Sequence, residues 1–242
     1  MATLRSLARV VAAPILIAQA LQVRRIALRL PEAEGPRRGC TGQGPIRRLL
    51  VLGDSAAAGV GATTQDQALL GRLVGELQSR HLVSYELIAR SGWRCADALA
   101  AMRQVAPRPL DDVVLSLGVN DATRHTPLAE LERQLRALIA LLTDRFGATR
   151  VVLSGLPPLG RFPLLPQPLR WFLGARAREV DRLLEQVARS AGVDYLKLDF
   201  SVGFGVEQMA SDGFHPGPEI YHHWARELAL RLHGQPAVED AR

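Results

Sequence analysis

The chain has 242 residues, a length that suits one α/β domain, and its hydrophobic content of 48% allows a large buried core and excludes a disordered or fibrous protein. The net charge of +6 is uneven: the segment through Arg48 holds nine arginines and two acidic residues, and the remaining chain is close to neutral. Basic patches interleaved with aromatic residues are absent, which argues against nucleic-acid binding, and Cys40 and Cys95 give neither a disulfide framework nor a metal-binding pattern.

The N-terminal segment, residues 1–44, is expected to lie outside the main domain. Its apolar run over residues 10–21 is too short to span a bilayer, which needs about 20 residues. Three interpretations stay open: a helix packed on the body of the protein, a helix resting on a membrane surface, and a signal peptide over residues 1–20. Arginines directly after the run oppose export. We expect a cytoplasmic protein and slightly favour the packed helix, with peripheral membrane contact and export as the alternatives. A connector is expected over residues 31–44, where Pro, Gly and Arg accumulate.

After the connector, short aliphatic runs alternate with longer segments of helical spacing. Strands are predicted at residues 48–53, 83–89, 112–117, 150–154 and 193–198. Helices are predicted at residues 65–80, 96–105, 127–146, 170–191 and 218–232. This alternation is typical of a five-stranded parallel sheet covered on both faces, with ligands at the carboxyl ends of the strands. The domain is predicted to span residues 45–234, followed by a tail at 235–242.

Two local patterns point to nucleophilic catalysis. Ser55, in the sequence GDSAAAG, directly follows the first predicted strand, so its hydroxyl is expected at the carboxyl edge of the sheet. Asp212 precedes His215 by three residues, a spacing that lets the carboxylate bond Nδ1 and leave Nε2 free to accept a proton from a serine. Each pattern alone is weak, since the first also suits a simple turn and the second a local ion pair.

Two further residues supply hydrogen-bond donors at the same predicted edge. Gly92 follows the second predicted strand, where the absence of a Cβ lets its N–H approach a reacting carbonyl. Asn120, in the sequence GVND, follows the third predicted strand. Together with the Ser55 N–H, these groups would form an oxyanion hole, although each position also suits an ordinary turn.

The ordered set of Ser55, Gly92, Asn120 and the DGFHP block around His215 resembles the SGNH (GDSL) hydrolase family. The resemblance extends from about Arg48 to the C-terminus. It implies a flavodoxin-like, three-layer α/β/α fold and a bacterial esterase-like enzyme. Ser55 would be the nucleophile, His215 the general base and Asp212 its orienting partner, with Ser55, Gly92 and Asn120 forming the oxyanion hole. No metal or organic cofactor is implied.

The expected activity is hydrolysis of short-chain acyl esters, with Trp93, Ala56 and Phe214 as candidates for the substrate pocket. The same site also suits an acyltransferase, a thioesterase, a lysophospholipase or a carbohydrate acetylesterase. A protein that only binds a partner through its basic N-terminal segment is the non-enzymatic alternative. A proline-rich stretch over residues 156–168 is expected either to border the site or to be an inert surface connection. The oligomeric state does not follow from the sequence.

Overall fold

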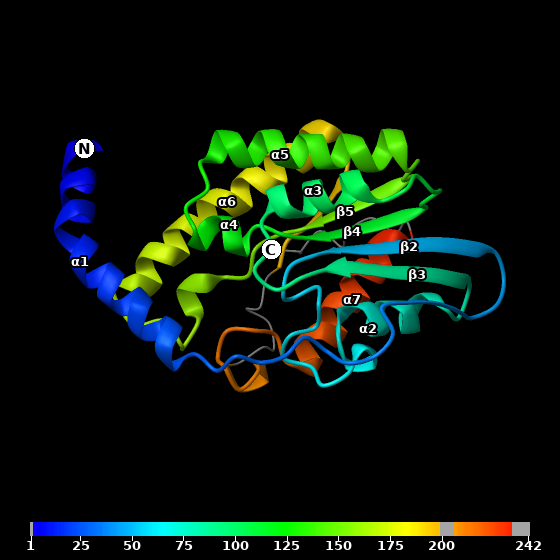
Figure 1. Ribbon diagram of the computed structural model, residues 1–242, viewed down its shortest axis with the longest axis horizontal. Helices are drawn as coiled ribbons and strands as arrows, with labels where there is room; N and C mark the ends of the chain where they lie inside the picture. The colour runs from blue at the N-terminus through cyan, green and yellow to red at the C-terminus, as the bar shows by residue number, and fades with distance from the viewer. Residues whose placement is uncertain (1, 199–205, 234–242) are drawn as a thin grey trace, which may run out of the picture.

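A six-stranded sheet forms the centre of the molecule in the computed structural model, which describes residues 2–198 and 206–233 (Figure 1). The strands lie in the order β1-β3-β2-β4-β5-β6. Their bounds are β1 Arg38–Thr41, β2 Ile46–Gly53, β3 Leu82–Ala89, β4 Asp112–Ser116, β5 Arg150–Ser154 and β6 Asp194–Leu196. Strands β2 to β6 are parallel, and β1 runs antiparallel to β3 at one edge.

The order of the five parallel strands confirms the flavodoxin-like prediction. The chain passes from β2 to β3 on one side, returns to β4 on the other side of β2, and then continues outward to β6. Ligands of such sheets bind where the strand order reverses, outside the carboxyl ends of the strands. In this protein the reversal lies between β2 and β4.

Strand β1 corrects the prediction of five strands, and it lies in the segment predicted as a connector, residues 31–44. All four of its residues pair with β3. The strand is short and mostly exposed, so it lacks the alternation that indicates a strand in a sequence. A Cβ at Gly39 would lie 2.5 Å from the hydroxyl of Tyr85 on the neighbouring strand, so a larger residue there would make the Tyr85 side chain move.

Helices cover both faces of the sheet, with α2 and α7 on one face and α3, α5 and α6 on the other (Figure 1). The α-helices are α1 Ala2–Ile26, α2 Leu69–Leu77, α3 Cys95–Gln104, α4 Val119–Thr123, α5 Leu128–Ala140, α6 Leu169–Ala191 and α7 Pro218–Leu232. Short 3₁₀ segments occupy Gln65–Gln67, Leu159–Arg161 and Val206–Gln208, and Leu141–Arg145 continues α5 as a π-helical turn.

Each face of the sheet has its own hydrophobic core, and strand β2 contributes to both. Leu50 and Leu52 pack under α3, α5 and α6, whereas Leu49 and Val51 pack under α2 and α7. All four side chains are at most 1% exposed. A strand buried on both faces must be apolar at successive positions, which explains the uninterrupted run at the end of β2.

The predicted helices are present with altered ends. The helix predicted over residues 65–80 is instead a 3₁₀ turn, Gln65–Gln67, followed by α2. The buried side-chain amide of Gln65 donates to the carbonyls of Ala33 and Ala58, which holds the chain in that turn. Helix α4 was not predicted, because five residues are too few to show a periodic pattern. The predicted tail, residues 235–242, lies outside the described residues.

Helix α1 lies against the start of α6 and projects from the rest of the molecule (Figure 1). On its inner side Leu16 and Val23 pack against the core beneath α6. Gln19 adds two hydrogen bonds, donating to the carbonyl of Gln167 (2.6 Å) and accepting from the N–H of Leu169 (3.0 Å). Among the described residues, no helix combines the length and apolar character needed to cross a membrane.

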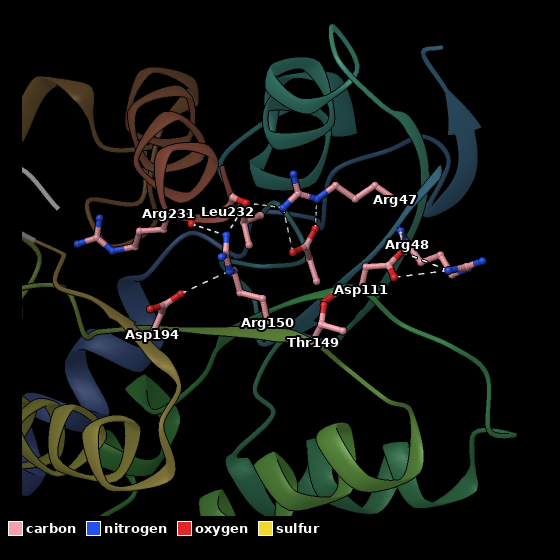
Figure 2. Close-up of polar contacts among 9 residues, drawn as sticks. Arg47, Arg48, Asp111, Thr149, Arg150, Asp194, Arg231 and Leu232 are labelled. Carbon is pink, nitrogen blue, oxygen red and sulfur yellow. Dashed lines mark hydrogen bonds and ion pairs between the residues drawn. The ribbon is translucent and has the colours of Figure 1, made fainter. Parts of the chain in front are cut away.

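Arginines connect the amino-terminal edge of the sheet to the end of α7 (Figure 2). Arg47 of β2 forms an ion pair with Asp112 of β4 and donates to the carbonyl of Leu232 (2.5 Å). Arg150 of β5 donates to the carbonyls of Arg231 (2.9 Å) and Leu232 (2.6 Å). The last carbonyls of a helix have no partner within it, so these guanidinium groups complete α7 and fix it to the sheet.

Candidate active site

Ser55 lies immediately after β2, at the reversal of strand order. Gly53 ends the strand, and a Cβ there would lie 2.4 Å from the carbonyl oxygen of Ser116 on β4, so a side chain would force the strands apart. Ser55 opens a tight turn in which its carbonyl accepts from the N–H of Val60 (3.0 Å). The Ser55 N–H donates to no other backbone carbonyl in the described part of the chain. Ser55 lines the cavity at this crevice, and its N–H is without a backbone acceptor among the described residues.

Asp212 and His215 lie on the tight turn that precedes α7. Gly213 has a positive φ of 61°, a conformation that favours glycine and lets the chain reverse between the two side chains. The carboxylate oxygen Oδ1 of Asp212 accepts from the backbone N–H groups of Phe214 (2.9 Å) and His215 (3.0 Å). Contacts within the turn alone therefore hold the Asp212 carboxylate beside the His215 imidazole.

The structure brings the expected catalytic residues into one hydrogen-bonded chain. His215 Nδ1 lies 2.5 Å from Asp212 Oδ2, and His215 Nε2 lies 2.9 Å from Ser55 Oγ. A carboxylate at Nδ1 holds the proton on that nitrogen and leaves Nε2 as the acceptor toward the serine. The order and the distances are those required for a serine activated by an imidazole.

The surroundings of Asp212 favour its ionised form, which is the partner of the His215 imidazole. Burial works to raise the pKa of this carboxyl, but hydrogen bonds from the His215 ring and from the backbone N–H groups of His215 and Phe214 outweigh it. The net effect is a pKa below the ordinary value of an aspartate. Asp212 is therefore a carboxylate throughout the neutral range.

Asn120 joins the loops that follow β2, β3 and β4. Its side-chain Nδ2 donates to the carbonyl of Trp93 (3.0 Å) and to Oδ2 of Asp54 (3.3 Å). The first bond places Asn120 beside the turn of Gly92, which has a positive φ of 84°, and the second places it beside Ser55. The three expected oxyanion donors thus come from neighbouring loops, but both N–H groups of Asn120 already have acceptors within the protein.

Asp54 also belongs to this arrangement, and its contact with Asn120 was not predicted from the sequence. Its carboxylate accepts from the N–H of Ala56 (3.1 Å), which braces the turn, and also from the side-chain amide of Asn120 (3.3 Å). The residue is 3% exposed, and this burial raises the pKa of its carboxyl to about 6. A buried aspartate therefore connects the turn of Ser55 to the side chain of Asn120.

A cavity of about 250 Å³ opens beside Ser55 and His215. Of the three predicted pocket residues, Ala56 and Phe214 line it, and the structure places Trp93 outside its lining. Trp93 instead packs, partly buried, against the core beneath α3 and α5. The wall is mostly apolar and includes Leu117, Val119, Leu198, Met209, Ile220 and Trp224.

The proline-rich stretch over residues 156–168 forms one side of the cavity. It therefore borders the site and is not an inert surface connection. Pro157, Pro158, Arg161 and Phe162 all line the cavity, and the ring of Phe162 packs edge-on against Phe214 with centroids 5.3 Å apart. The remaining wall residues carry no recognisable signal in the sequence. They are ordinary aliphatic and aromatic residues whose role depends on where the loops lie.

The fold and this site are typical of an ester-cleaving hydrolase. Residues 51–223 match the model of the GDSL-like lipase/acylhydrolase family, and the chain belongs to this family. This confirms the resemblance found in the sequence and supports hydrolysis of an ester. A comparison with functionally curated proteins gave no match.

Solved structures with the same fold include several esterases. A lipase/acylhydrolase from Enterococcus faecalis has a TM-score of 0.61 and 19% identity, over 78% of this chain and 96% of that one. A carbohydrate acetylesterase from Sinorhizobium meliloti has a TM-score of 0.55 and 19% identity, over 77% and 98%. An acetyl xylan esterase from Geobacillus stearothermophilus has a TM-score of 0.55 and 22% identity, over 80% and 96%. At these identities the similarity shows the fold alone.

Proposed function

We propose that the chain is a serine esterase that hydrolyses short-chain acyl esters through an acyl-enzyme on Ser55. The observation that carries the proposal is the hydrogen-bonded chain from Asp212 through His215 to Ser55, with distances of 2.5 and 2.9 Å. Family membership supports the ester bond as the target. The position of Ser55 beside an apolar cavity supports an acyl group as its substrate.

In the proposed reaction, His215 Nε2 takes the hydroxyl proton of Ser55 while Oγ attacks the carbonyl carbon of the ester. The imidazolium then returns this proton to the alcohol oxygen, and the alcohol leaves with the acyl group bound to Ser55. A water molecule, deprotonated by the same nitrogen, attacks the acyl carbonyl. The acid departs and Ser55 regains its proton.

The oxyanion of each step would be bound by the N–H groups of Ser55 and Gly92 and by the amide of Asn120. Asn120 must share or release one of its present acceptors, Trp93 or Asp54, to do so. Donors aimed at developing charge contribute strongly, and loss of one typically lowers kcat by about 10²–10³. The proposal therefore includes a small reorientation of Asn120 when substrate binds.

The cavity supports acyl chains of several carbons. A water molecule in the liquid occupies about 30 Å³, and the cavity of about 250 Å³ is several times larger. Each methylene that it buries can contribute about 0.8 kcal/mol, or up to about fourfold in kcat/KM. We expect kcat/KM to rise from p-nitrophenyl acetate to butyrate and to fall once the chain outgrows the cavity.

The deciding experiment compares the wild type with Ser55→Ala on p-nitrophenyl butyrate and on a fluorophosphonate probe. We expect kcat to fall by about 10⁴–10⁶ in the variant, and we expect stoichiometric labelling of the wild type only. Ser79→Ala, which removes an exposed serine at the end of α2, is the matched control. A Ser55→Ala variant with full activity and full labelling would refute the proposal, and absence of labelling in the wild type would favour the non-enzymatic alternative.

A further inference from the structure

Exposed apolar side chains are concentrated at one place on the surface, around α1 and the start of α6. Among the described residues, eight large hydrophobic side chains are exposed, and six of them belong to this region, each more than half exposed. We call them the α1 patch: Ile15, Ile17, Leu21, Ile26, Leu28 and Trp171. Scattered apolar residues are normal on a surface, whereas a group of this size marks an interaction site.

The patch extends over two elements, because α1 is joined directly to the start of α6. Gln19 is hydrogen-bonded to both Gln167 and Leu169, and Trp171 follows two residues later. Figure 1 shows α1 alongside this part of α6 with no other element over its outer side. Apolar residues lie on more than one side of α1. Within residues 13–26, whose side chains are described, Leu16 and Val23 pack against the core, whereas the apolar patch residues of the helix are exposed.

All charged residues of the chain before Glu32 are arginines. Arg24, Arg25 and Arg29 are exposed and form a shallow hollow together with Leu21, Ile26 and Leu28. No acidic residue occurs in the sequence before Glu32. Two copies of the chain meeting through this patch would bring six arginines together with no acidic residue of the segment to offset them. A negatively charged partner fits better.

We propose that the α1 patch binds the surface of a lipid bilayer that contains anionic lipids. The apolar side chains would enter the boundary between head groups and acyl chains, and the three arginines would contact lipid phosphates. The loop that ends at Gln167, which Gln19 binds, also lines the catalytic cavity through Pro158 and Phe162. Membrane binding therefore brings the rim of the cavity close to the bilayer. This inference does not depend on the esterase proposal, because it concerns binding alone.

The test is sedimentation of the full-length protein with vesicles of phosphatidylcholine, either alone or mixed with phosphatidylglycerol. We expect the wild type to bind the mixed vesicles and to bind pure phosphatidylcholine far less. Leu21→Glu with Ile26→Glu should weaken binding to mixed vesicles at least about tenfold. The matched control is Ile46→Glu with Leu230→Glu, which changes the two exposed apolar residues outside the patch and should bind as the wild type does.

The arginines are tested by a second pair of variants. Replacing Arg24, Arg25 and Arg29 by Gln should weaken partition to mixed vesicles by about a hundredfold. Replacing the exposed Arg38, Arg80 and Arg103 by Gln changes the net charge equally and should have little effect.

Four results would overturn the proposal. The first is a wild type that stays in the supernatant with both kinds of vesicle, and the second is an equal loss of binding in the control variants. The third is a dimer in the absence of lipid that the Leu21→Glu, Ile26→Glu variant dissociates, since the patch would then be an interface between two copies. A mature chain that begins after residue 20 in the producing organism would likewise contradict it, because the segment would be a signal peptide.

Discussion

The buried carboxyl group of Asp54 makes the stability of the protein depend on pH. Burial raises its pKa from 3.8 to about 6, so the folded protein binds this proton more tightly than the unfolded chain does. The contribution of this group to the free energy of unfolding is therefore largest below about pH 4 and declines as the pH rises to about 6.

Asp54→Asn removes this decline, because asparagine does not ionise. The difference in free energy of unfolding, variant minus wild type, should therefore become larger by about 3 kcal/mol between about pH 4 and pH 7. Urea unfolding at several pH values measures the difference, with the exposed Asp66→Asn variant as a control for the loss of one negative charge. A difference that stays constant with pH would show that the carboxyl is not perturbed.

Asp212 has the opposite shift, and its replacement tests its role in the proposed mechanism. Hydrogen bonds from His215 and the backbone outweigh burial and keep the pKa of Asp212 below its ordinary value, so the carboxylate is present at every pH above about 4. Asp212→Asn should lower kcat by about 10³–10⁴ because the His215 tautomer is no longer fixed, with KM little changed. Steady-state kinetics with p-nitrophenyl butyrate measures both constants, and an unchanged kcat would exclude the proposed role.

The positions of the candidate site residues could be predicted from the sequence where they lie close in the chain or at predicted strand ends. The spacing of Asp212 and His215 was sufficient to predict their contact, and the end of β2 was sufficient to place Ser55. The contact between Asp54 and Asn120 was not predicted, because it depends on how two loops meet. Trp93 lies outside the cavity that it was predicted to line for the same reason, because its position also depends on how the loops meet.

At the scale of elements, the ion pair between β2 and β4 anchors the end of α7. The side chains of Arg47 and Asp112 are only 13% and 3% exposed. Arg47→Met should lower the free energy of unfolding by about 3–5 kcal/mol, because it leaves the carboxylate of Asp112 buried without a partner. Arg47→Met combined with Asp112→Leu should cost clearly less, since no unpaired charge remains. Denaturant unfolding of the three proteins provides the test, and a double variant at least as unstable as the single one would contradict it.

Short elements account for most of the differences between the predicted and the observed fold. Strand β1 and helix α4 have four and five residues, too few for a period of two or of 3.6 to be recognised. The long elements were predicted to within a few residues. Helix α6 ends at Ala191 as expected, and Gly192 adopts the left-handed conformation of a helix stop.

At the scale of the whole molecule, the domain is expected to extend closer to the N-terminus than residue 45. Glu32 accepts from the N–H of Ser91 (2.6 Å), and Ala33 is 5% exposed. A chain that starts at residue 45 would lose these contacts and β1, whereas one that starts at residue 31 keeps them. We expect the shorter protein to melt at a temperature roughly 5 °C or more below the longer one. Equal melting temperatures would support the boundary predicted from the sequence.

The overall architecture could be predicted because alternating strands and helices allow few arrangements. Parallel strands with helical crossovers on both faces lead to a doubly covered sheet, and the family resemblance specified the order of its strands. The identity of the ester could not be predicted in the same way. It depends on the shape of a cavity whose wall comes from several separate segments, among them the loops after β4 and β5 and the start of α7.

Ser55 and His215 are separated by 160 positions in the chain, yet their side chains lie 2.9 Å apart. His215 is held by the turn before α7, which is the last helix of the described chain. During synthesis, the sheet and four of its covering helices emerge from the ribosome before this turn does. In the proposed mechanism, a nascent or prematurely terminated chain therefore contains the serine without its base. Under this proposal, a copy of the protein that ends before His215 cannot cleave esters.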